Sequence, residues 1–578
     1  MSATRLAKDG SSRSDLRRAL EACRSSFLSA GFFSLFVNVL LLVPALYMLQ
    51  IYDRVLSSRS GPTLLYLTLF AAACLITMAA LELVRSRILV RLGGKLDGLL
   101  SREVFNSVLN NGRTGQSFRD LENVRAFLTG AGMLALLDAP WTPVYIALVY
   151  ALHPMLGHVA LAGAVILFLL GLINERATRT PLMKAGMEMA ASTQFAELSA
   201  RNSDVVHAMG MLPGLQSVWR KRHDMGLRLQ AEASDRAGEV AATAKFVRLF
   251  LQVAILGVGA YLVIGQEASA GAMIAASIIM GRGLAPVESA IGAWRGFLQA
   301  REGYSRIKEE LEKNGRGADP MPLPAPSGAL SLENVIALPP GGQKPVINNI
   351  SVELKAGVSL GITGPSAAGK SSLARLMVGV WKPASGTIRL DGVNLATWQR
   401  EEVGPHIGYL PQDIELFPGT VAENIARFGR VDSSLVIEAA TLAGAHQMIL
   451  ELPNGYDTLI GPAGNNLSGG QRQRIGLSRA FYGMPSLIVL DEPSSNLDAE
   501  GEAAVRQAID ALREMGKTVV VIAHRPSLLG GTNVMMVIQR GAVTSFGPTH
   551  QVMPLITRSV ESVSDQSAVK SGESSHGG

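Results

Sequence analysis

The chain has 578 residues, of which 48% are hydrophobic and only 17% are charged. This length excludes one ordinary domain, and the positive mean hydropathy of +0.25 points to membrane insertion. A net charge of +6 and a pI near 9.3 would suit nucleic acid. The basic residues are, however, spread along the loops with little aromatic interleaving, so we expect no nucleic-acid partner. Cys23 and Cys74 are far apart and indicate neither a disulfide framework nor a metal site.

The chain begins with a polar, basic segment, residues 1–26, which lacks the apolar core and cleavage site of a secretory signal peptide. Six apolar stretches follow, each near the roughly 20 residues that cross a bilayer. They are residues 27–51, 61–84, 133–152, 156–173, 246–265 and 271–290. The fourth is short, and the sixth is interrupted by Arg282, Gly283 and Pro286. Six membrane spans remain the best interpretation.

The charges of the connections orient these spans. Lys and Arg gather in the N-terminal segment and in residues 85–130 and 174–245, whereas the connectors 153–155 and 266–270 carry none and 53–60 carries two. Because positively charged loops stay on the cytosolic side, we predict that both termini and the two long connections are cytosolic.

Composition changes again after the spans. Residues 313–328 are rich in Gly and Pro, which indicates a semi-extended linker. The last residues, rich in Ser, Gly and charge, are typical of a disordered tail. We predict a cytosolic N-terminal segment, a six-helix membrane domain, a linker, an α/β domain and a tail. Their bounds are 1–26, 27–312, 313–328, 329–556 and 557–578.

The strongest motif is Gly-Pro-Ser-Ala-Ala-Gly-Lys-Ser at residues 364–371, between a β-rich run and a helix-forming run. It matches the G-x-x-x-x-G-K-[ST] pattern of phosphate-binding loops, whose backbone N–H groups converge on phosphate oxygens beside a helix N-terminus. Lys370 is expected to reach the β- and γ-phosphates, and the Ser371 hydroxyl to ligate Mg²⁺. The predicted nucleotide contacts are Gly364, Pro365, Ser366, Ala367, Ala368, Gly369, Lys370, Ser371 and Ser372.

Two acids end another apolar run. Asp491 and Glu492 follow Leu-Ile-Val-Leu at 487–490, as at the end of a buried parallel strand. Asp491 is expected to hold Mg²⁺ through water, and Glu492 to polarise the attacking water. His524 ends a third such run, 517–523, and could contact the γ-phosphate. Each alone could be a surface or structural group, but at strand ends, where α/β sheets bind ligands, they together favour catalysis.

Residues 467–471, Leu-Ser-Gly-Gly-Gln, open a predicted helix. Alone they would indicate a turn and a helix cap. Between the phosphate-binding loop and the acidic strand, they resemble the signature motif of ABC-family ATPases. Gln412 resembles that family's Q-loop and residues 495–498 its D-loop, and the resemblance covers residues 329–555. It implies an α/β nucleotide-binding domain that takes ATP and Mg²⁺, with Gln412 as a further catalytic and metal-ligating residue. The signature implies further nucleotide contacts at Ser468, Gly469, Gly470 and Gln471.

One stretch departs from the family pattern. Many such domains place an aromatic residue near the first strand to stack on adenine, but residues 333–341 contain none. Apolar contact from Leu338 or Pro339 could replace the stack, with less preference for ATP over other nucleotides.

Six spans with two long cytosolic connections and one ATPase domain resemble an ABC exporter half-transporter. In that fold short coupling helices at the loop tips press on the nucleotide domains, and we place these tips at 117–128 and 220–235, with ordinary solvated helix as the alternative. The chain has one phosphate-binding loop and one signature, and in this family each site takes the two motifs from opposite domains. We therefore expect a two-fold homodimer.

The membrane half is similar to the PrtD-type family of type I secretion exporters. The stretches that carry this similarity are 43–55, 119–121, 127–130, 137–145, 153–157 and 208–212. The similarity implies ATP-driven export of an unfolded protein with a C-terminal secretion signal. It further implies a lipid-embedded, multi-pass protein of the bacterial inner membrane, with a periplasmic membrane-fusion adaptor and a TolC-type outer-membrane channel as partners.

Two other functions stay open: export of a polysaccharide, glycolipid or lipid by the same kind of ATP-driven transporter, and a nucleotide-gated channel. Glu492 and His524 argue against the channel, since gating does not need rapid hydrolysis. Asp138 and Arg282 could merely anchor helix ends, but polar groups in or beside the spans could also line a translocation path. They are Asn38, Asp138, Gln252, Arg282 and Glu288.

Overall fold

The computed structural model describes residues 15–111, 116–313, 323–461 and 464–554. The chain forms two compact units, Met1–Arg316 and Gly317–Gly578. The division falls inside the predicted linker, 313–328. The predicted tail, most of that linker and residues 1–14 of the N-terminal segment lie outside the described residues.

The secondary-structure elements of the first unit are all helices in its described residues, and six helical segments are long and apolar enough to cross a membrane. The predicted count of six spans is confirmed. The elements are α1 (Asp15–Leu40), α2 (Val43–Gln50), η1 (Ile51–Val55), α3 (Leu56–Ser58), α4 (Gly61–Asn111), α5 (Gln116–Thr129), α6 (Ala131–Asp138), η2 (Ala139–Trp141), α7 (Thr142–Leu152), α8 (Pro154–Arg201), α9 (Ser203–Ala208), α10 (Leu212–Ile264), α11 (Ala270–Gly292) and α12 (Trp294–Lys313).

Prolines divide the first and third spans into shorter helices but do not divide the sixth. Pro44 lies in the first turn of α2 and has no N–H to continue α1. Pro140 and Pro143 likewise divide the third span into α6, η2 and α7. The sixth span, which the sequence predicted to be interrupted, is instead one helix that passes through the buried Pro286. Tight packing against α7 accompanies this continuity, because a Cβ at Gly283 would lie 2.8 Å from the Cβ of Tyr145.

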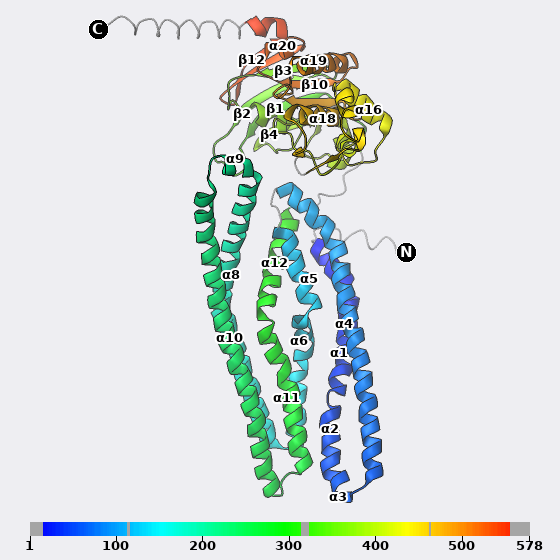
Figure 1. The fold of residues 1–578 in the computed structure, drawn as a ribbon, viewed down its shortest axis with the longest axis vertical. Helices are drawn as coiled ribbons and strands as arrows, with labels where there is room; N and C mark the ends of the chain where they lie inside the picture. The colour runs from blue at the N-terminus through cyan, green and yellow to red at the C-terminus, as the bar shows by residue number, and fades with distance from the viewer. Residues whose placement is uncertain (1–14, 112–115, 314–322, 462–463, 555–578) are drawn as a thin grey trace, which may run out of the picture. The chain divides into compact units, whose positions relative to one another are not determined.

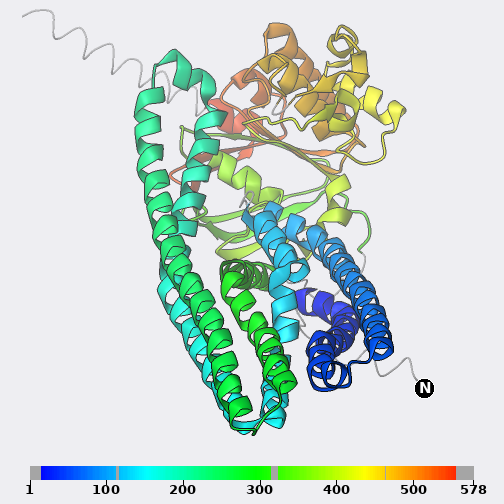
Figure 2. The ribbon, with the colours of Figure 1, turned by 60° about the horizontal axis from the view of Figure 1, so that its bottom comes forward.

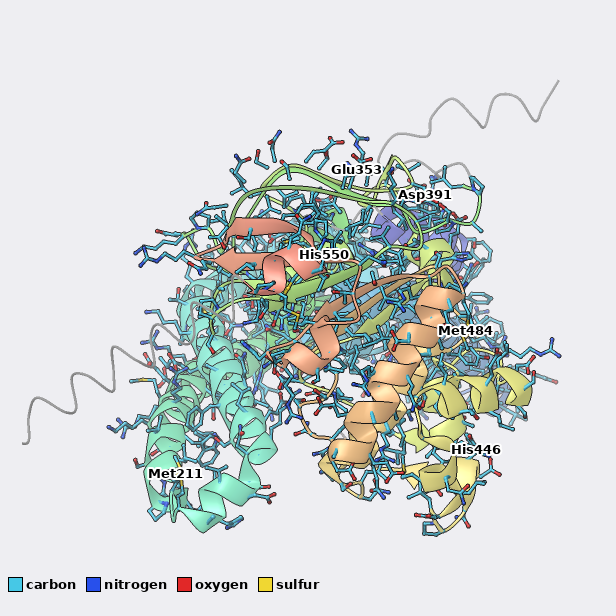
Figure 3. All side chains as sticks on the ribbon, turned by 90° about the horizontal axis from the view of Figure 1, so that it is seen from above. Met211, Glu353, Asp391, His446, Met484 and His550 are labelled. Atoms are coloured by element: carbon cyan, nitrogen blue, oxygen red, sulfur yellow. The ribbon has the colours of Figure 1, made fainter. Side chains whose placement is uncertain are left out.

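Helices α8 and α10 lie side by side in both views, and α9 lies at the end where they meet (Figures 1 and 2). They contain 48 and 53 residues. At about 1.5 Å per residue, each is more than twice as long as the roughly 30 Å of bilayer hydrocarbon. The predicted coupling tip at 220–235 is wrong, because those residues lie inside α10. The chain reverses at α9 and at Met211, which is labelled in Figure 3.

The other predicted coupling tip, 117–128, is also wrong. These residues belong to α5, and one face of α5 is buried against its own unit. The carboxylate of Asp120 accepts two hydrogen bonds from Arg306 of α12, at 2.7 and 2.6 Å, and the Ser117 hydroxyl donates to Glu310 at 2.8 Å. These contacts hold α5 inside the bundle. Residues 112–115, between α4 and α5, lie outside the described residues.

A buried polar network joins helices α1, α4, α6 and α7, which belong to the first three spans. One carboxylate oxygen of Asp138 accepts hydrogen bonds from Arg85 at 2.9 Å, from the Asn38 amide at 2.8 Å and from the hydroxyl of Ser34. Tyr145 donates to the Asn38 carbonyl at 2.8 Å. Arg85 is only 3% exposed and Asn38 only 2%. The structure therefore favours the anchoring interpretation for Asp138, and Asn38 belongs to the same buried network.

The other polar groups near the spans differ in environment. Glu288 of α11 forms an ion pair with Arg248 of α10, with 2.5 Å between carboxylate and guanidinium. Arg282 is exposed on α11 and Gln252 is half-buried on α10. A role in a translocation path stays a prediction for Arg282 and Gln252.

The second unit contains a four-stranded antiparallel sheet, a six-stranded, mainly parallel sheet and a helical part. The elements are β1 (Leu330–Ala337), β2 (Ile347–Leu354), β3 (Ser359–Thr363), α13 (Lys370–Met377), β4 (Ser385–Leu390), β5 (Val393–Asn394), α14 (Arg400–Val403), η3 (Gly404–His406), β6 (Ile407–Leu410), β7 (Gly419–Thr420), α15 (Val421–Ile425), α16 (Ser433–Leu442), α17 (His446–Leu450), η4 (Gly455–Asp457), β8 (Leu459–Ile460), α18 (Gly469–Phe481), β9 (Leu487–Asp491), α19 (Ala499–Glu514), β10 (Thr518–Ile522), α20 (Pro526–Leu529), β11 (Val534–Gln539) and β12 (Ala542–Pro548).

The six-stranded sheet has the order β12-β11-β3-β10-β9-β6 and separates two hydrophobic cores. Alternate residues of β9 enter opposite cores: Ile488 and Leu490 on one face, Leu487 and Val489 on the other. The predicted apolar strands are thus buried on both faces. In the parallel ladder, Ile522 of β10 pairs with both Ile362 of β3 and Asp491 of β9. The segments that follow these strands therefore start at one edge of the sheet.

We predict that Asp138→Asn destabilises the membrane unit. The change removes the charge that faces the buried Arg85 guanidinium, and breaking a buried ion pair costs about 3 kcal/mol. The side chain of Asp138 keeps 20% exposure, so we expect this lower end of the usual range. Thermal unfolding of the detergent-purified protein measures the effect.

Glu122→Gln is the matched control, since Glu122 pairs with Arg125 on the exposed face of α5. It should unfold like wild type. The double variant Arg85→Leu/Asp138→Leu should regain stability relative to Asp138→Asn, because it leaves no unpaired charge. An Asp138→Asn protein as stable as wild type would contradict this account of the network.

Candidate active site

The phosphate-binding loop lies between β3 and α13. Gly364 allows close approach of backbone, since a Cβ there would lie 2.1 Å from the carbonyl oxygen of Ile538. Gly369 has φ +99°, in the region that glycine favours. Ala367 has φ +62°, an uncommon conformation for a residue with a Cβ. The loop therefore bends as a backbone cradle for phosphate oxygens requires.

Lys370 is the first residue of α13, and its side chain folds back over the loop. Its ammonium donates to the carbonyl oxygens of Gly364 at 2.9 Å and Pro365 at 3.0 Å. Burial lowers the pKa of Lys370, and the nearby charges of Glu492 and Asp491 oppose this shift. The ammonium is thus held at the place where a phosphate chain would lie.

The predicted metal ligands lie together beside this loop. Asp491 ends β9 and is 1% exposed, and its Oδ1 has no hydrogen-bond partner among the described residues. Burial raises the pKa of Asp491, while a hydrogen bond with Ser371 lowers it. The Ser371 hydroxyl oxygen also lies 3.4 Å from Gln412 Oε1. A buried orphan carboxylate oxygen, a hydroxyl and an amide oxygen fit Mg²⁺, which prefers oxygen ligands and keeps several waters.

The predicted catalytic residues meet at Glu492. Its carboxylate accepts a hydrogen bond from the Gln412 amide at 3.4 Å and lies 3.5 Å from His524 Nε2. The backbone of Glu492 has φ +52°, an unfavourable value for a residue with a long side chain. Its N–H donates to the Ile522 carbonyl at 2.9 Å, so β10 holds this strained residue in place. The arrangement can orient and polarise a water molecule next to the phosphate-binding loop.

The signature residues are placed differently. Ser468 caps α18 and forms a capping box with Gln471, through bonds of 3.2 and 2.9 Å. Among the described residues, the side-chain hydrogen bonds of Ser468 and Gln471 stay within this cap, whereas Gln412 contacts both Ser371 and Glu492. Gly469 and Gly470 lie against Asn496 of the predicted D-loop.

Sequence reasoning missed one residue of this region, Gln473. Its side chain is fully buried, and its amide donates to the carbonyls of Pro493 at 2.8 Å and Glu492 at 3.3 Å. A glutamine in an amphipathic helix gives no sequence signal for such a contact. Gln473 also lines a cavity of about 300 Å³ between α18 and the Gln412 segment.

The stretch without aromatic residues forms a turn near the phosphate-binding loop. Gly342 N–H donates to the Pro339 carbonyl at 2.9 Å, and Gly341 has φ +75°, which fits a type II turn. Leu338 is 41% exposed. The same hairpin reaches the loop, because a Cβ at Gly369 would lie 2.9 Å from the Val346 carbonyl oxygen. The predicted base contacts, Leu338 and Pro339, therefore belong to a hairpin that borders the phosphate-binding loop.

Models of known protein families match both units of the chain. Residues 27–283 match the family model of the ABC transporter transmembrane region, and residues 347–495 match that of the ABC transporter. The solved structure of a bacterial Atm1-family ABC exporter with ATP bound superimposes with a TM-score of 0.80. It covers 94% of this chain and 98% of that chain at 20% identity, which establishes the fold.

Two relatives are similar over most of the chain. The type I secretion system ATP-binding protein PrsD of Rhizobium meliloti is 43% identical over 96% of this chain and 97% of its own. The leukotoxin translocation ATP-binding protein LktB of Mannheimia haemolytica is 30% identical over 92% of this chain and 76% of its own. The chain therefore belongs to the ABC transporters, in the family of type I secretion ATP-binding proteins, and is a multi-pass membrane protein whose ATPase domain binds and hydrolyses ATP.

Proposed function

We propose that this chain exports an unfolded protein with a C-terminal secretion signal across the bacterial inner membrane, as the ATP-driven component of a type I secretion system. The observation that carries the proposal is the 43% identity to PrsD along nearly the whole of both chains. Its partners are the secreted protein, a periplasmic membrane-fusion adaptor and a TolC-type outer-membrane channel. Both termini and the ATPase domain are cytosolic, in line with the basic connections between the spans.

The residues of the site have distinct roles in this proposal. The backbone of residues 364–372 and the ammonium of Lys370 hold the phosphates of ATP. Ser371 and Gln412 would hold Mg²⁺ directly, and Asp491 through water; the metal would supply positive charge at the phosphates. Glu492 polarises the attacking water, and His524, paired with Glu492, contacts the γ-phosphate.

A second copy of the chain completes each site. Ser468 is exposed at the start of α18, and the hydrogen bonds that it makes in the described residues lie within its own cap. It is free to contact ATP on a facing copy, as are Gly469, Gly470 and Gln471. ATP binding closes the two domains on each other, hydrolysis releases them, and this movement drives the membrane helices.

The cargo assignment rests on the relatives. Export of a polysaccharide or lipid would use the same ATPase and membrane domains. LktB is named for translocation of a toxin and PrsD for type I secretion, which favours a protein cargo. A nucleotide-gated channel is disfavoured, since Glu492 and His524 lie 3.5 Å apart beside the phosphate-binding loop, as hydrolysis requires.

Glu492→Gln should bind ATP normally and hydrolyse it about a hundredfold more slowly, because loss of a general base costs about 10²–10⁴ in rate. Bacteria with this variant should lose at least one extracellular protein. Hydrolysis of ATP by the purified protein and a secretome comparison measure the two effects. Glu500→Gln, an exposed glutamate at the start of α19, is the control and should match wild type.

The outcomes separate the candidate functions. Loss of hydrolysis with an unchanged protein secretome but altered extracellular carbohydrate would favour sugar export. Unchanged hydrolysis in Glu492→Gln would refute the assigned role of this carboxylate.

Mixed dimers test the shared site. Lys370→Ala and Ser468→Arg should each abolish hydrolysis when expressed alone. Co-expressed, they should regain about a quarter of wild-type activity, because half of randomly assorted dimers have one intact site. A pair of affinity tags isolates the mixed dimers. If these isolated dimers hydrolyse no ATP, the two motifs do not act across a dimer.

Pro339→Tyr should add a ring for the base at the hairpin beside the phosphate-binding loop. Base–aromatic stacking is worth about 1 kcal/mol or more, so the KM for ATP should fall about fivefold. Hydrolysis of ATP and GTP by wild type should differ little in KM. Leu450→Tyr, which adds a ring on the exposed side of α17, is the control. An unchanged KM in Pro339→Tyr would place the base elsewhere.

A further inference from the structure

Gln473 is an unusual side chain for the interior of the ATPase domain. It lies on α18, five residues after Ser468, and its relative exposure is 0%. Buried amides are stable only when their hydrogen bonds are satisfied. The amide nitrogen of Gln473 donates to the carbonyls of Pro493 at 2.8 Å and Glu492 at 3.3 Å, and its oxygen accepts from Asn496 at 3.5 Å.

Two of these hydrogen bonds are made to the backbone at Glu492, a residue in a strained conformation, and at Pro493. Glu492 has φ +52°, which costs about 1–3 kcal/mol unless the surroundings enforce it. On one side of this residue, its N–H is held by the Ile522 carbonyl of β10 at 2.9 Å. On the other side, its own carbonyl and the next one are held by Gln473. The peptide groups before and after the strained residue are thus both fixed.

The direction of the Glu492 side chain follows from this backbone. A relaxed φ would turn the carboxylate away from His524, at 3.5 Å, and from the Gln412 amide, at 3.4 Å. Misplacement of a reacting group by about 1 Å can cost a hundredfold in rate.

We propose that Gln473 is a positioning residue for hydrolysis, which keeps Glu492 in its strained conformation and thereby ties the signature helix α18 to the hydrolytic carboxylate of the same chain. The inference rests on the proposed role of Glu492. It assigns Gln473 no contact with ATP, water or metal.

Gln473→Met tests the proposal, since methionine has a similar length and no donor. The purified full-length variant should show a kcat about tenfold to a hundredfold lower, with the affinity for a fluorescent ATP analogue changed less than about twofold. Ser478→Ala is the matched control. Ser478 is also fully buried on α18, but its hydroxyl donates to the Arg474 carbonyl of its own helix. This control should hydrolyse ATP like wild type.

A double-mutant cycle separates positioning from a general structural effect. If Gln473 acts through the Glu492 carboxylate, adding Gln473→Met to Glu492→Gln should not lower the residual hydrolysis further. Additive losses would overturn the proposal, because they would show that Gln473 acts independently of Glu492. If wild type hydrolyses ATP and Glu492→Gln hydrolyses it slowly, the role of Glu492 is established without reference to Gln473. The role of Glu492 and the positioning role of Gln473 can therefore fail independently.

Gln473→Asn provides a second test if Gln473→Met does not fold. It keeps a buried amide but withdraws the donor by about 1.5 Å, one bond length. Its kcat should fall in the same direction, again with unchanged nucleotide affinity. A folded Gln473→Met or Gln473→Asn protein with wild-type kcat would refute the positioning role.

Discussion

The site depends first on the register of three neighbouring parallel strands. β10 lies between β3 and β9, and its Ile522 is level with Ile362 on one side and Asp491 on the other. This alignment brings the phosphate-binding loop, the two acids and His524 to one sheet edge, where α/β sheets bind ligands. A slip of one residue in β9 would exchange its two faces and withdraw Asp491 from the edge. The two hydrophobic cores that β9 separates prevent such a slip.

Much of this arrangement could be predicted from the sequence. The spacing of Gly364, Gly369 and Lys370 identifies the loop, and the apolar runs before Asp491 and His524 identify buried strands. These signals are local, and strand ends follow from them directly. The six spans were predictable for the same reason, since a continuous apolar run is read without knowledge of its neighbours.

The missed features depend on contacts between distant segments. The helix around 220–235 has the polar composition of a loop tip, but its hydrogen bonds and packing on α8 continue the helix far past the membrane. The partner of Asp138 is Arg85, 53 residues earlier, and no periodicity links them. Gln473 looks like a solvent-facing residue of an amphipathic helix, but the segment that follows β9, with Glu492, Pro493 and Asn496, contacts its side chain. The conformation of Glu492 is likewise imposed by β10 and α18 and not by its own residue type.

The folded-back side chain of Lys370 has a consequence for which ligands the loop accepts. Its ammonium already donates hydrogen bonds to the Gly364 and Pro365 carbonyls, so a ligand has to replace two neutral acceptors. Charged acceptors form hydrogen bonds roughly twice as strong as neutral ones, and only an anion of high charge density gains by the exchange. The loop therefore discriminates against uncharged ligands such as adenosine, which offer Lys370 no charged acceptor in exchange for these two carbonyls.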